Sequence, residues 1–484
     1  MGPPAAGAPG SPWDPLGTVR ATPHHTHPKE VHLHTFNAEG SAALGGPQWL
    51  RDRRAAGLSA VQSSAMPAES EEVWRYTPID DLDLDEFAPV AAPSAGLPED
   101  ARIVTDVVIE SVGPLSGQVL VHNGFPLSFG PPQPGGNGRA ARNAVFGGAV
   151  LGGAAEVPGG QAMVGGVQVG GDALVRLNDA FLPDVVLVDV PEGVVVPEPI
   201  LIVHWCDGPG TATTGPAIFP RTCVRLGHGA RASVIEVYAG PPGSTRSLVV
   251  PVTELSAGDE AAVSYVALQI LNHAAWSIAR LSARGGKDAV VRTFTVGLGG
   301  DYDRVRADVS VDGRGARSEI LSAYFGSGTQ VHDVRTLQDH VAARTNSELL
   351  CQGAVAGTSR SVYSGLIRVH RGAVRCDARQ TNHNLVLDEG AHADSVPNLD
   401  ILENDVKCSH ASTVGPIDED QRYYIESRGV TPDVAEGLIV RGFFDAIIDR
   451  GPIAAVTPLL KHEVHARLDV ALGDRRAVRE AADV

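Results

Sequence analysis

The sequence lacks several features that would place it in a class at once. It has no uninterrupted apolar run of about 18 residues or more, so nothing in it predicts a membrane-spanning helix. Basic residues are the minority, with 39 Lys and Arg against 57 Asp and Glu and a net charge of −18. Nucleic acid is therefore not expected as a partner, because phosphate binding needs a basic surface.

Cysteine is scarce, with five in 484 residues, and their odd number and wide spacing argue against a disulfide framework. No two cysteines form a CxxC pair, so a closed structural zinc site made by this chain alone is not expected. The pattern suits a reducing cytosol. The cysteines are Cys206, Cys223, Cys351, Cys376 and Cys408.

Two motifs are also absent. The opening residues, MGPPAAGAPGSPWDP, have no charged region followed by an apolar one, so no secretory signal is expected and the prediction is a cytoplasmic protein. No GxxxxGK[ST] phosphate loop occurs, so the chain is not expected to bind ATP by itself.

The composition that remains predicts a globular chain of two or three domains, with 43% apolar residues and a mean hydropathy of −0.01. Residues 1–45 are rich in Pro, Gly and His and are expected to be a disordered tail. Residues 46–171 form a mixed region with a Gly-rich insertion. Residues 172–415 are the expected β core, and 416–484 a helical domain.

The predicted core consists of short runs of Val, Ile, Leu and Thr between turns that hold Gly, Asp or Asn. A spacing near 18 residues between Gly-Ala pairs, without room for helices, favours strands stacked in rungs as in a parallel β-helix. An antiparallel sandwich is the alternative. The pairs expected at turns are Gly229-Ala230, Gly315-Ala316, Gly353-Ala354, Gly372-Ala373 and Gly390-Ala391.

Helix signals dominate after Gly415. Asp418 to Ser427 reads as one helix, with Gly429 at its C-terminal cap. Thr431-Pro432 then supplies an N-cap and a first-position proline for a second, amphipathic helix. A third is expected over 458–472.

One short motif carries candidate chemistry, the sequence DVKCSHASTVG at 405–415. In a strand, Cys408 and His410 project from the same side because successive side chains alternate faces. A thiol and an imidazole on one face can present soft and borderline ligands to iron, zinc or copper. Ordinary packing is the alternative for such a pair.

The residues around this motif resemble those of a known family. The run from about 332 to 445 is similar to the core of the SufB/SufD proteins of iron–sulfur cluster assembly. The segment EEVWRYTPI at 71–79, with a short expected helix before it, adds an N-terminal match. The matching pieces, in order, are SVYSG at 361–365, QTN at 380–382, PNLDI at 397–401, DVKCSH at 405–410 and SRGV at 427–430.

Within the family the chain is most like SufD. SufB-like chains typically carry a cysteine where this sequence has Gln380-Thr381-Asn382, and a Glu-His pair where it has Ser409-His410. Cys408-Ser409-His410 and the EEVWRYTP start are the patterns usual in SufD. Ala411-Ser412 departs from the family's more frequent Gly-Ala.

The resemblance implies a mainly β fold, a right-handed parallel β-helix with α-helical N- and C-terminal segments. It implies a non-catalytic subunit that pairs with a SufB-like paralogue and binds the ABC ATPase SufC through its C-terminal helices. SufC dimerises on ATP and opens the interface, where a nascent iron–sulfur cluster forms transiently. His410 is then the candidate metal ligand and Cys408 the second cluster-handling candidate. A homodimer is expected when the chain is alone, with no nucleic acid or membrane partner.

Two other functions stay open. The chain is alternatively the SufB-like scaffold itself, although Thr381 stands in place of the expected thiol. It is otherwise a β-helix enzyme acting on carbohydrates, but such enzymes need clustered acids in a groove, and the sequence shows no such group of Asp and Glu beyond the expected surface turns.

Overall fold

The computed structural model describes residues 34–93, 96–130, 143–157, 159–167, 171–208, 210, 213–243 and 245–482, all within one compact unit, His32–Val484. Most of the tail predicted at 1–45 lies outside the described residues. Its last part is not a tail: Ala38–Ala43 forms helix α1, capped by the Asn37 side chain, and Phe36 is fully buried beside it.

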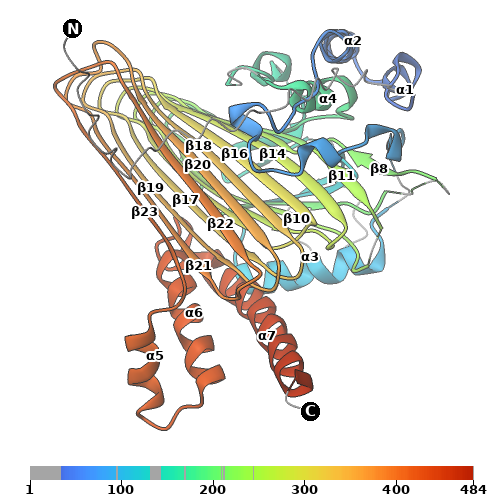
Figure 1. Ribbon diagram of the computed structural model, residues 1–484. Helices are drawn as coiled ribbons and strands as arrows, with labels where there is room; N and C mark the ends of the chain where they lie inside the picture. Colours follow the sequence, from blue (N-terminus) through green and yellow to red (C-terminus); the bar gives the residue numbers. More distant parts are fainter. Residues whose placement is uncertain are drawn as a thin grey trace, which may run out of the picture. The chain divides into compact units, whose positions relative to one another are not determined.

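Two long sheets of parallel strands form the body of the protein, and the chain passes from one sheet to the other at each half-turn (Figure 1). This is the predicted parallel β-helix. Sheet A runs in the order β22-β20-β18-β16-β14-β12-β9-β6, and sheet B in the order β23-β21-β19-β17-β15-β13-β10-β7-β2. The strands from β6 on are β6 Val186–Val190, β7 Ile200–Trp205, β8 Gly215–Ile218, β9 Arg221–Leu226, β10 Arg231–Ala239, β11 Ser247–Val249, β12 Val252–Ala257, β13 Ala262–Ile270, β14 Ala275–Gly285, β15 Val290–Gly297, β16 Tyr302–Val311, β17 Arg317–Gly326, β18 Val331–His340, β19 Asn346–Val355, β20 Arg360–Val369, β21 Asp377–Val386, β22 His392–Ile401 and β23 Lys407–Gly415.

The repeat length differs from the predicted spacing near 18. Val331 pairs with Arg360, 29 positions further along, because each turn of the solenoid contains one strand of each sheet. Gly353-Ala354 is not a turn but lies inside β19. The Gly-Ala pairs therefore do not mark a single repeating position.

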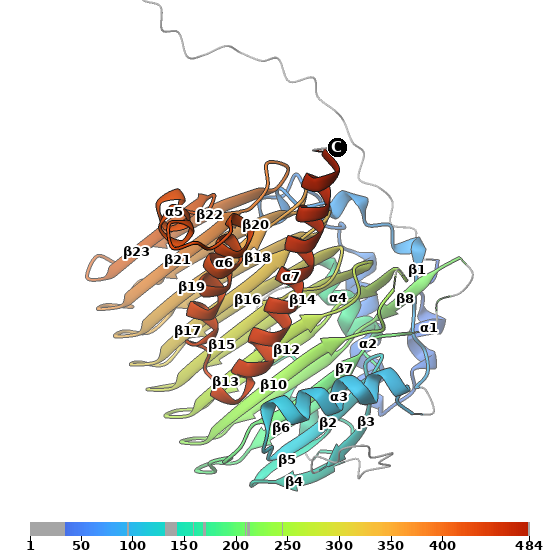
Figure 2. The same cartoon turned by 90° about the horizontal axis from the view of Figure 1, so that it is seen from below.

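The strands are apolar on both sides because both faces of sheet B are covered. In β17, Ile320 and Tyr324 point into the solenoid, whereas Leu321 and Phe325 point outwards to the helices. Helices α3, α6 and α7 lie along that outer face (Figure 2). Near-continuous hydrophobic sequence is typical of such doubly buried parallel strands.

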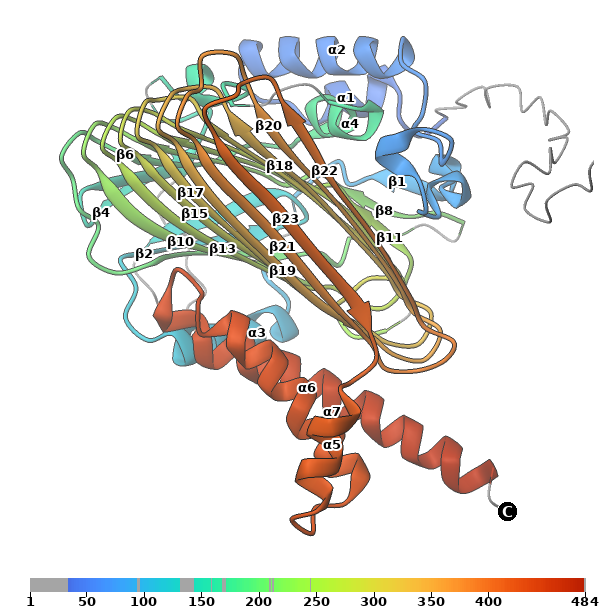
Figure 3. The same cartoon turned by 60° about the vertical axis from the view of Figure 1, so that its left-hand side comes forward.

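The N-terminal elements lie against the early rungs, with α1, α2 and α4 on the other side of the solenoid from α6 and α7 (Figure 3). Arg54 is a buried residue of α2, and its side chain donates to the carbonyls of Leu182 and Pro183. The elements are α2 Gln48–Gln62, η1 Glu72–Trp74, η2 Ile79–Asp81, η3 Leu84–Glu86, β1 Phe87–Pro89, α3 Glu99–Val112, β2 Gly117–His122, β3 Phe125–Gly130, β4 Asn143–Phe146, β5 Ala149–Gly153, η4 Gly160–Met163 and α4 Ala173–Phe181.

The C-terminal helices begin where their capping residues predict. They are α5 Glu419–Glu426, α6 Pro432–Ile448, η5 Ala454–Val456 and α7 Thr457–Ala482. Asp418 caps α5 by accepting from the N–H groups of Asp420 and Gln421, and Pro432 occupies the first turn of α6. Helix α7 is longer than the stretch predicted at 458–472.

Candidate functional site

The Cys-x-His motif lies on β23, the last strand of sheet B, which pairs with β21 on one side only. Cys408 stands beside Ala378 and His410 beside Gln380. Ala378 and Gln380 are buried residues of the solenoid interior, so Cys408 and His410 face the same, inner side. The prediction that they share a face is confirmed.

Cys408 is half-buried and packs into a small apolar cluster at the end of the solenoid. Burial, together with the neighbouring Cys376 and Asp377, raises the pKa of its thiol. A thiol in these surroundings stays protonated, and the thiolate is the form that attacks or binds metal. The cluster consists of Ile367, Val369, Ala373, Cys376 and Ala378, with Val406 and Cys408 packed against it.

His410 is exposed, because no further rung covers the inner side of β23. Directly beneath it in the stack lies Gln380, 1% exposed, and neither side-chain atom of its amide has a hydrogen-bond partner among the described residues. Gly365 makes room for that amide, since a Cβ there would overlap both the Gln380 side chain and the Tyr363 hydroxyl. The imidazole is thus accessible and stands over a buried amide.

A hydrogen-bonded chain ties the two last strands together across the open end. The Ser395 hydroxyl of β22 lies 2.6 Å from the Ser412 hydroxyl of β23 and 2.9 Å from Oδ1 of Asn382. Asn384 donates to the same Asn382 oxygen at 2.9 Å. The contacts between these residues are not predictable from the sequence, because nothing in it places β22 opposite β21 and β23.

The last rung also exposes large apolar side chains. Leu399 and Ile401 continue inner columns whose earlier members, Ile367 and Val369, are fully buried, yet each is 40% exposed. Val414 on β23 is 43% exposed and Leu402 is 50% exposed. Sheet A therefore ends in an edge strand with a largely apolar inner side, whereas the inner side of β23 combines Val414 with His410 and Ser412.

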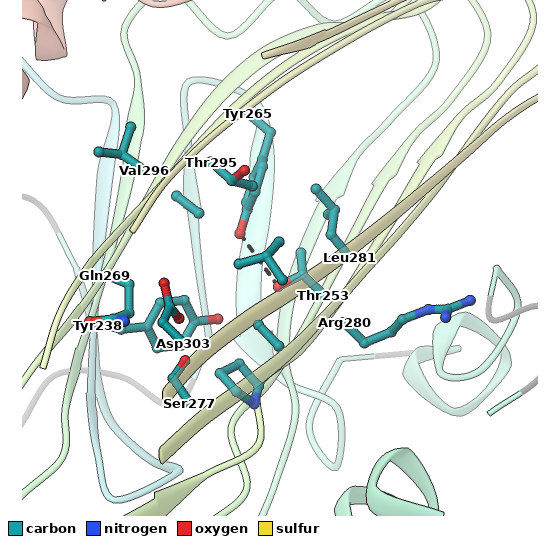
Figure 4. A pocket seen from close by; sticks show the side chains of 14 residues that line it. Tyr238, Thr253, Tyr265, Gln269, Ser277, Arg280, Leu281, Thr295, Val296 and Asp303 are labelled. Atoms are coloured by element: carbon teal, nitrogen blue, oxygen red, sulfur yellow. Dashed lines mark hydrogen bonds between the residues drawn. The ribbon is translucent and has the colours of Figure 1, made fainter. Parts of the chain in front are cut away.

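A second polar region lies deep inside the solenoid, around a cavity of about 40 Å³ lined by Tyr238, Tyr265, Thr253 and Asp303 among others (Figure 4). One carboxylate oxygen of Asp303 has no partner among the described residues. The cavity is large enough for a water molecule that could hydrogen-bond to it.

Beside the cavity, Glu236 is fully buried and lies 2.6 Å from Nε2 of His204. Burial opposes the ionisation of Glu236, but hydrogen bonds from His204, Thr222 and Tyr265 hold the pKa of its carboxyl below its usual value. The pair is enclosed by the strands and has no open approach. Nδ1 of His204 has no hydrogen-bond partner among the described residues, so this polar network of the interior is only partly satisfied.

The remaining candidates do not join the site. Cys351 and Cys376 are both buried, and Cys376 belongs to the apolar cluster that Cys408 packs against. His383 lies within β21, and its side chain is on the opposite face of the strand from that of Gln380. Across the described residues no three His, Cys, Asp or Glu side chains gather as a metal-binding group. None of the described helices has both the length and the apolar character needed to cross a membrane.

The fold and the motif define a class of protein, a parallel β-helix with helical termini and a Cys-x-His pair on its open last strand. The family model described as "SUF system FeS cluster assembly, SufBD core domain" matches residues 210–443. A SufBD family iron–sulfur cluster assembly protein of Mycobacterium tuberculosis is 39% identical over 196 residues, which cover 39% of this chain and 49% of that protein.

Two longer matches carry the name SufD. Iron–sulfur cluster assembly protein SufD of Escherichia coli is 26% identical over 439 residues, which are 90% of this chain and 94% of that protein. SufD of Bacillus subtilis is 27% identical over 296 residues, covering 61% and 66%. The chain matches about half the length of the mycobacterial relative and nearly all of the one from E. coli. Over these residues the chain is similar to the SufB/SufD proteins, and it is most like SufD.

Proposed function

We propose that the chain is the SufD-type, non-ATPase subunit of an iron–sulfur cluster assembly scaffold. In this role it pairs with a SufB-like chain through its last rung, in the cytoplasm. The observation that carries the proposal is the open end of the solenoid, where His410 and exposed apolar side chains share one surface. A strand from another β-helix can extend such an edge by main-chain hydrogen bonds.

The unpaired edge is unusual for a chain that acts alone. Natural proteins blunt exposed sheet edges with charge, proline or a covering segment. Here β22 holds Pro397, but Leu399 and Ile401 beside the edge remain apolar and 40% exposed. When a paralogue with the same rung geometry packs against this surface, the surface is removed from water. The same surface would let two copies of this chain pair when the paralogue is missing.

The C-terminal helices support a second contact, with an ABC ATPase. Helix α5 and the start of α6 project from the solenoid (Figure 1), and Tyr423, Tyr424, Val434 and Leu438 are exposed there. Aromatic residues of this kind are enriched where proteins bind each other. Because the β-helix and these helices are joined directly after β23, a pull on α5 acts on the strand that carries His410.

His410 is the residue we assign to the cluster, which is the cargo of the scaffold. Its exposed imidazole offers a nitrogen donor, and imidazole replaces thiolate on iron in known cluster sites. Cys408 is less suited, because its thiol is half-buried and its pKa is raised by that burial. The pair supplies at most two of the ligands that a cluster needs, so the paralogue would supply the others.

The test is co-expression with SufB-like and SufC-like partners, comparing wild type with His410→Ala for complex mass and anaerobic iron and sulfide content. We expect an intact complex whose iron and sulfide fall at least fivefold in the variant. His383→Ala is the matched control, since this histidine lies on the neighbouring strand but on the other face. A His410→Ala complex that loads like wild type would contradict the role of His410, and failure to form any complex would contradict the assembly role.

A further inference from the structure

The turns that lead into the sheet B strands form a stacked column at the end of the strands remote from α5 (Figure 3). In six successive turns, one left-handed residue has an N–H that donates to a carbonyl of the next turn, as from Arg344 to Val374 at 2.8 Å. Neighbouring turns are therefore about 4.8 Å apart, the spacing of paired strands. The left-handed residues are Gly229, Glu260, Asp288, Gly315, Arg344 and Arg375.

Arg344 and Arg375 occupy this position on adjacent rungs, with φ of 60° and 61°. A side chain in the left-handed region is strained, and like charges on neighbouring strands repel. Glycine fits the same position without strain at Gly229 and Gly315. Glu260 and Asp288 occupy the same position on two earlier adjacent rungs, so strain and like charge are not peculiar to the arginines, and the case for them rests on the hollow that they line.

Both arginines line a surface hollow of about 430 Å³, together with Arg317, Asp288 and Asp377. Arg317 and Arg344 are exposed, and neither side chain makes a hydrogen bond or ion pair with any residue that the structure describes. Arg375 has only an exposed contact to Asp405, with Nε 3.4 Å from the carboxylate. Such surface pairs contribute little to stability and are readily exchanged.

The two carboxylates of the hollow have cations of their own. Lys287 Nζ lies 3.8 Å from Asp288, and Arg379 Nε lies 3.4 Å from Asp377. The positive charges of Arg317 and Arg344 therefore face solvent in the same hollow, although the chain as a whole has a net charge of −18. A concentration of guanidinium groups without acidic partners is the chemistry of an oxyanion site, because each group presents a planar fork of donors.

We infer that this hollow binds a tetrahedral oxyanion, phosphate either free or as a monoester on a small molecule. Arg317 and Arg344 are its main ligands, and Arg375 joins them by leaving Asp405. The site is formed by turns that precede the last rung, at the end of the strands remote from α5, and its test uses the chain alone, so it does not depend on the proposed function.

The experiment is isothermal titration of the full chain with inorganic phosphate and, separately, with glycerol 3-phosphate, at constant ionic strength set by chloride. We expect saturable binding to wild type and at least tenfold weaker binding to Arg317→Gln and to Arg344→Gly. Arg231→Gln is the matched control, because Arg231 is also the exposed first residue of a sheet B strand but lies outside the hollow. It should bind like wild type.

Arg344→Gly separates binding from folding. Because glycine relieves the left-handed strain, this variant should melt no lower than wild type in phosphate-free buffer while losing affinity. Tighter binding of inorganic phosphate would identify the free ion as the ligand, and tighter binding of the ester a phosphorylated metabolite. The inference is overturned if wild type binds neither probe saturably, or if Arg344→Gly binds as tightly as wild type.

Discussion

At the scale of single residues, the solenoid interior depends on glycines that make room for larger neighbours. Tyr324, Gly353 and Asn384 occupy the same column on three successive rungs. The Tyr324 ring crosses the glycine so that its hydroxyl donates to Asn384. A side chain at 353 would occupy the position of that ring.

Gly353→Ala should therefore destabilise the protein, by about 2 to 4 kcal/mol, because a Cβ would overlap Tyr324 and the interior is closely packed. Chemical denaturation measures this change. Gly415→Ala, at a glycine with open space around it, should change stability little. If Gly353→Ala is as stable as wild type, the Tyr324 ring does not lie across residue 353.

A second prediction at this scale concerns Asp184, whose pKa burial raises to about 6 despite its hydrogen bond from Val185. A folded-state pKa above the unfolded value means that the ionised form is destabilised by folding. The penalty is absent below about pH 4, where the carboxyl is protonated in both states, and complete above about pH 6.

Asp184→Asn should then raise stability by up to about 3 kcal/mol at pH 8 and leave it nearly unchanged at pH 4. Thermal melts at the two pH values provide the measurement. The exposed acid Asp312 is the control, since Asp312→Asn changes no buried charge. A stabilisation that is the same at both pH values would rule out ionisation of Asp184 as its cause.

At the scale of elements, the sequence predicts what depends on local chemistry. Strand alternation places Cys408 and His410 on one face, and Thr431-Pro432 marks the start of α6. The sequence does not predict which strands pair with each other when they lie about 30 residues apart in the chain. The buried Gln380 under His410 and the Ser395–Ser412 contact arise from that register, so they appear only in the structure.

The edge strand β22 gives a prediction about association. Leu399→Glu introduces charge on a side chain that the isolated chain already exposes, so the melting temperature should change little. Pairing with a SufB-like chain should weaken at least tenfold, because that charge would be buried. Co-purification of the two chains measures this loss of pairing. Ile103→Glu, on an exposed position of α3, is the control and should pair normally. Normal pairing by Leu399→Glu would contradict the proposed interface.

At the scale of the whole molecule, the rungs stack as one column that is covered along sheet B by α3, α6 and α7 but ends openly at β22 and β23 (Figures 1 and 2). The composition and turn signals predict the solenoid but not its repeat, because Gly-Ala pairs occur in turns and in β19 alike. That each turn of the solenoid contains two strands is known only from the structure, in which Val331 pairs with Arg360.

The most direct test of the central claim is amide hydrogen exchange of the chain alone and in complex with a SufB-like partner. Pairing through the last rung predicts slower exchange on complex formation over β22 and β23, residues 392–415, and no change over β10 and β13. Exchange in β22 and β23 that stays as fast in the complex as in the free chain would contradict the account.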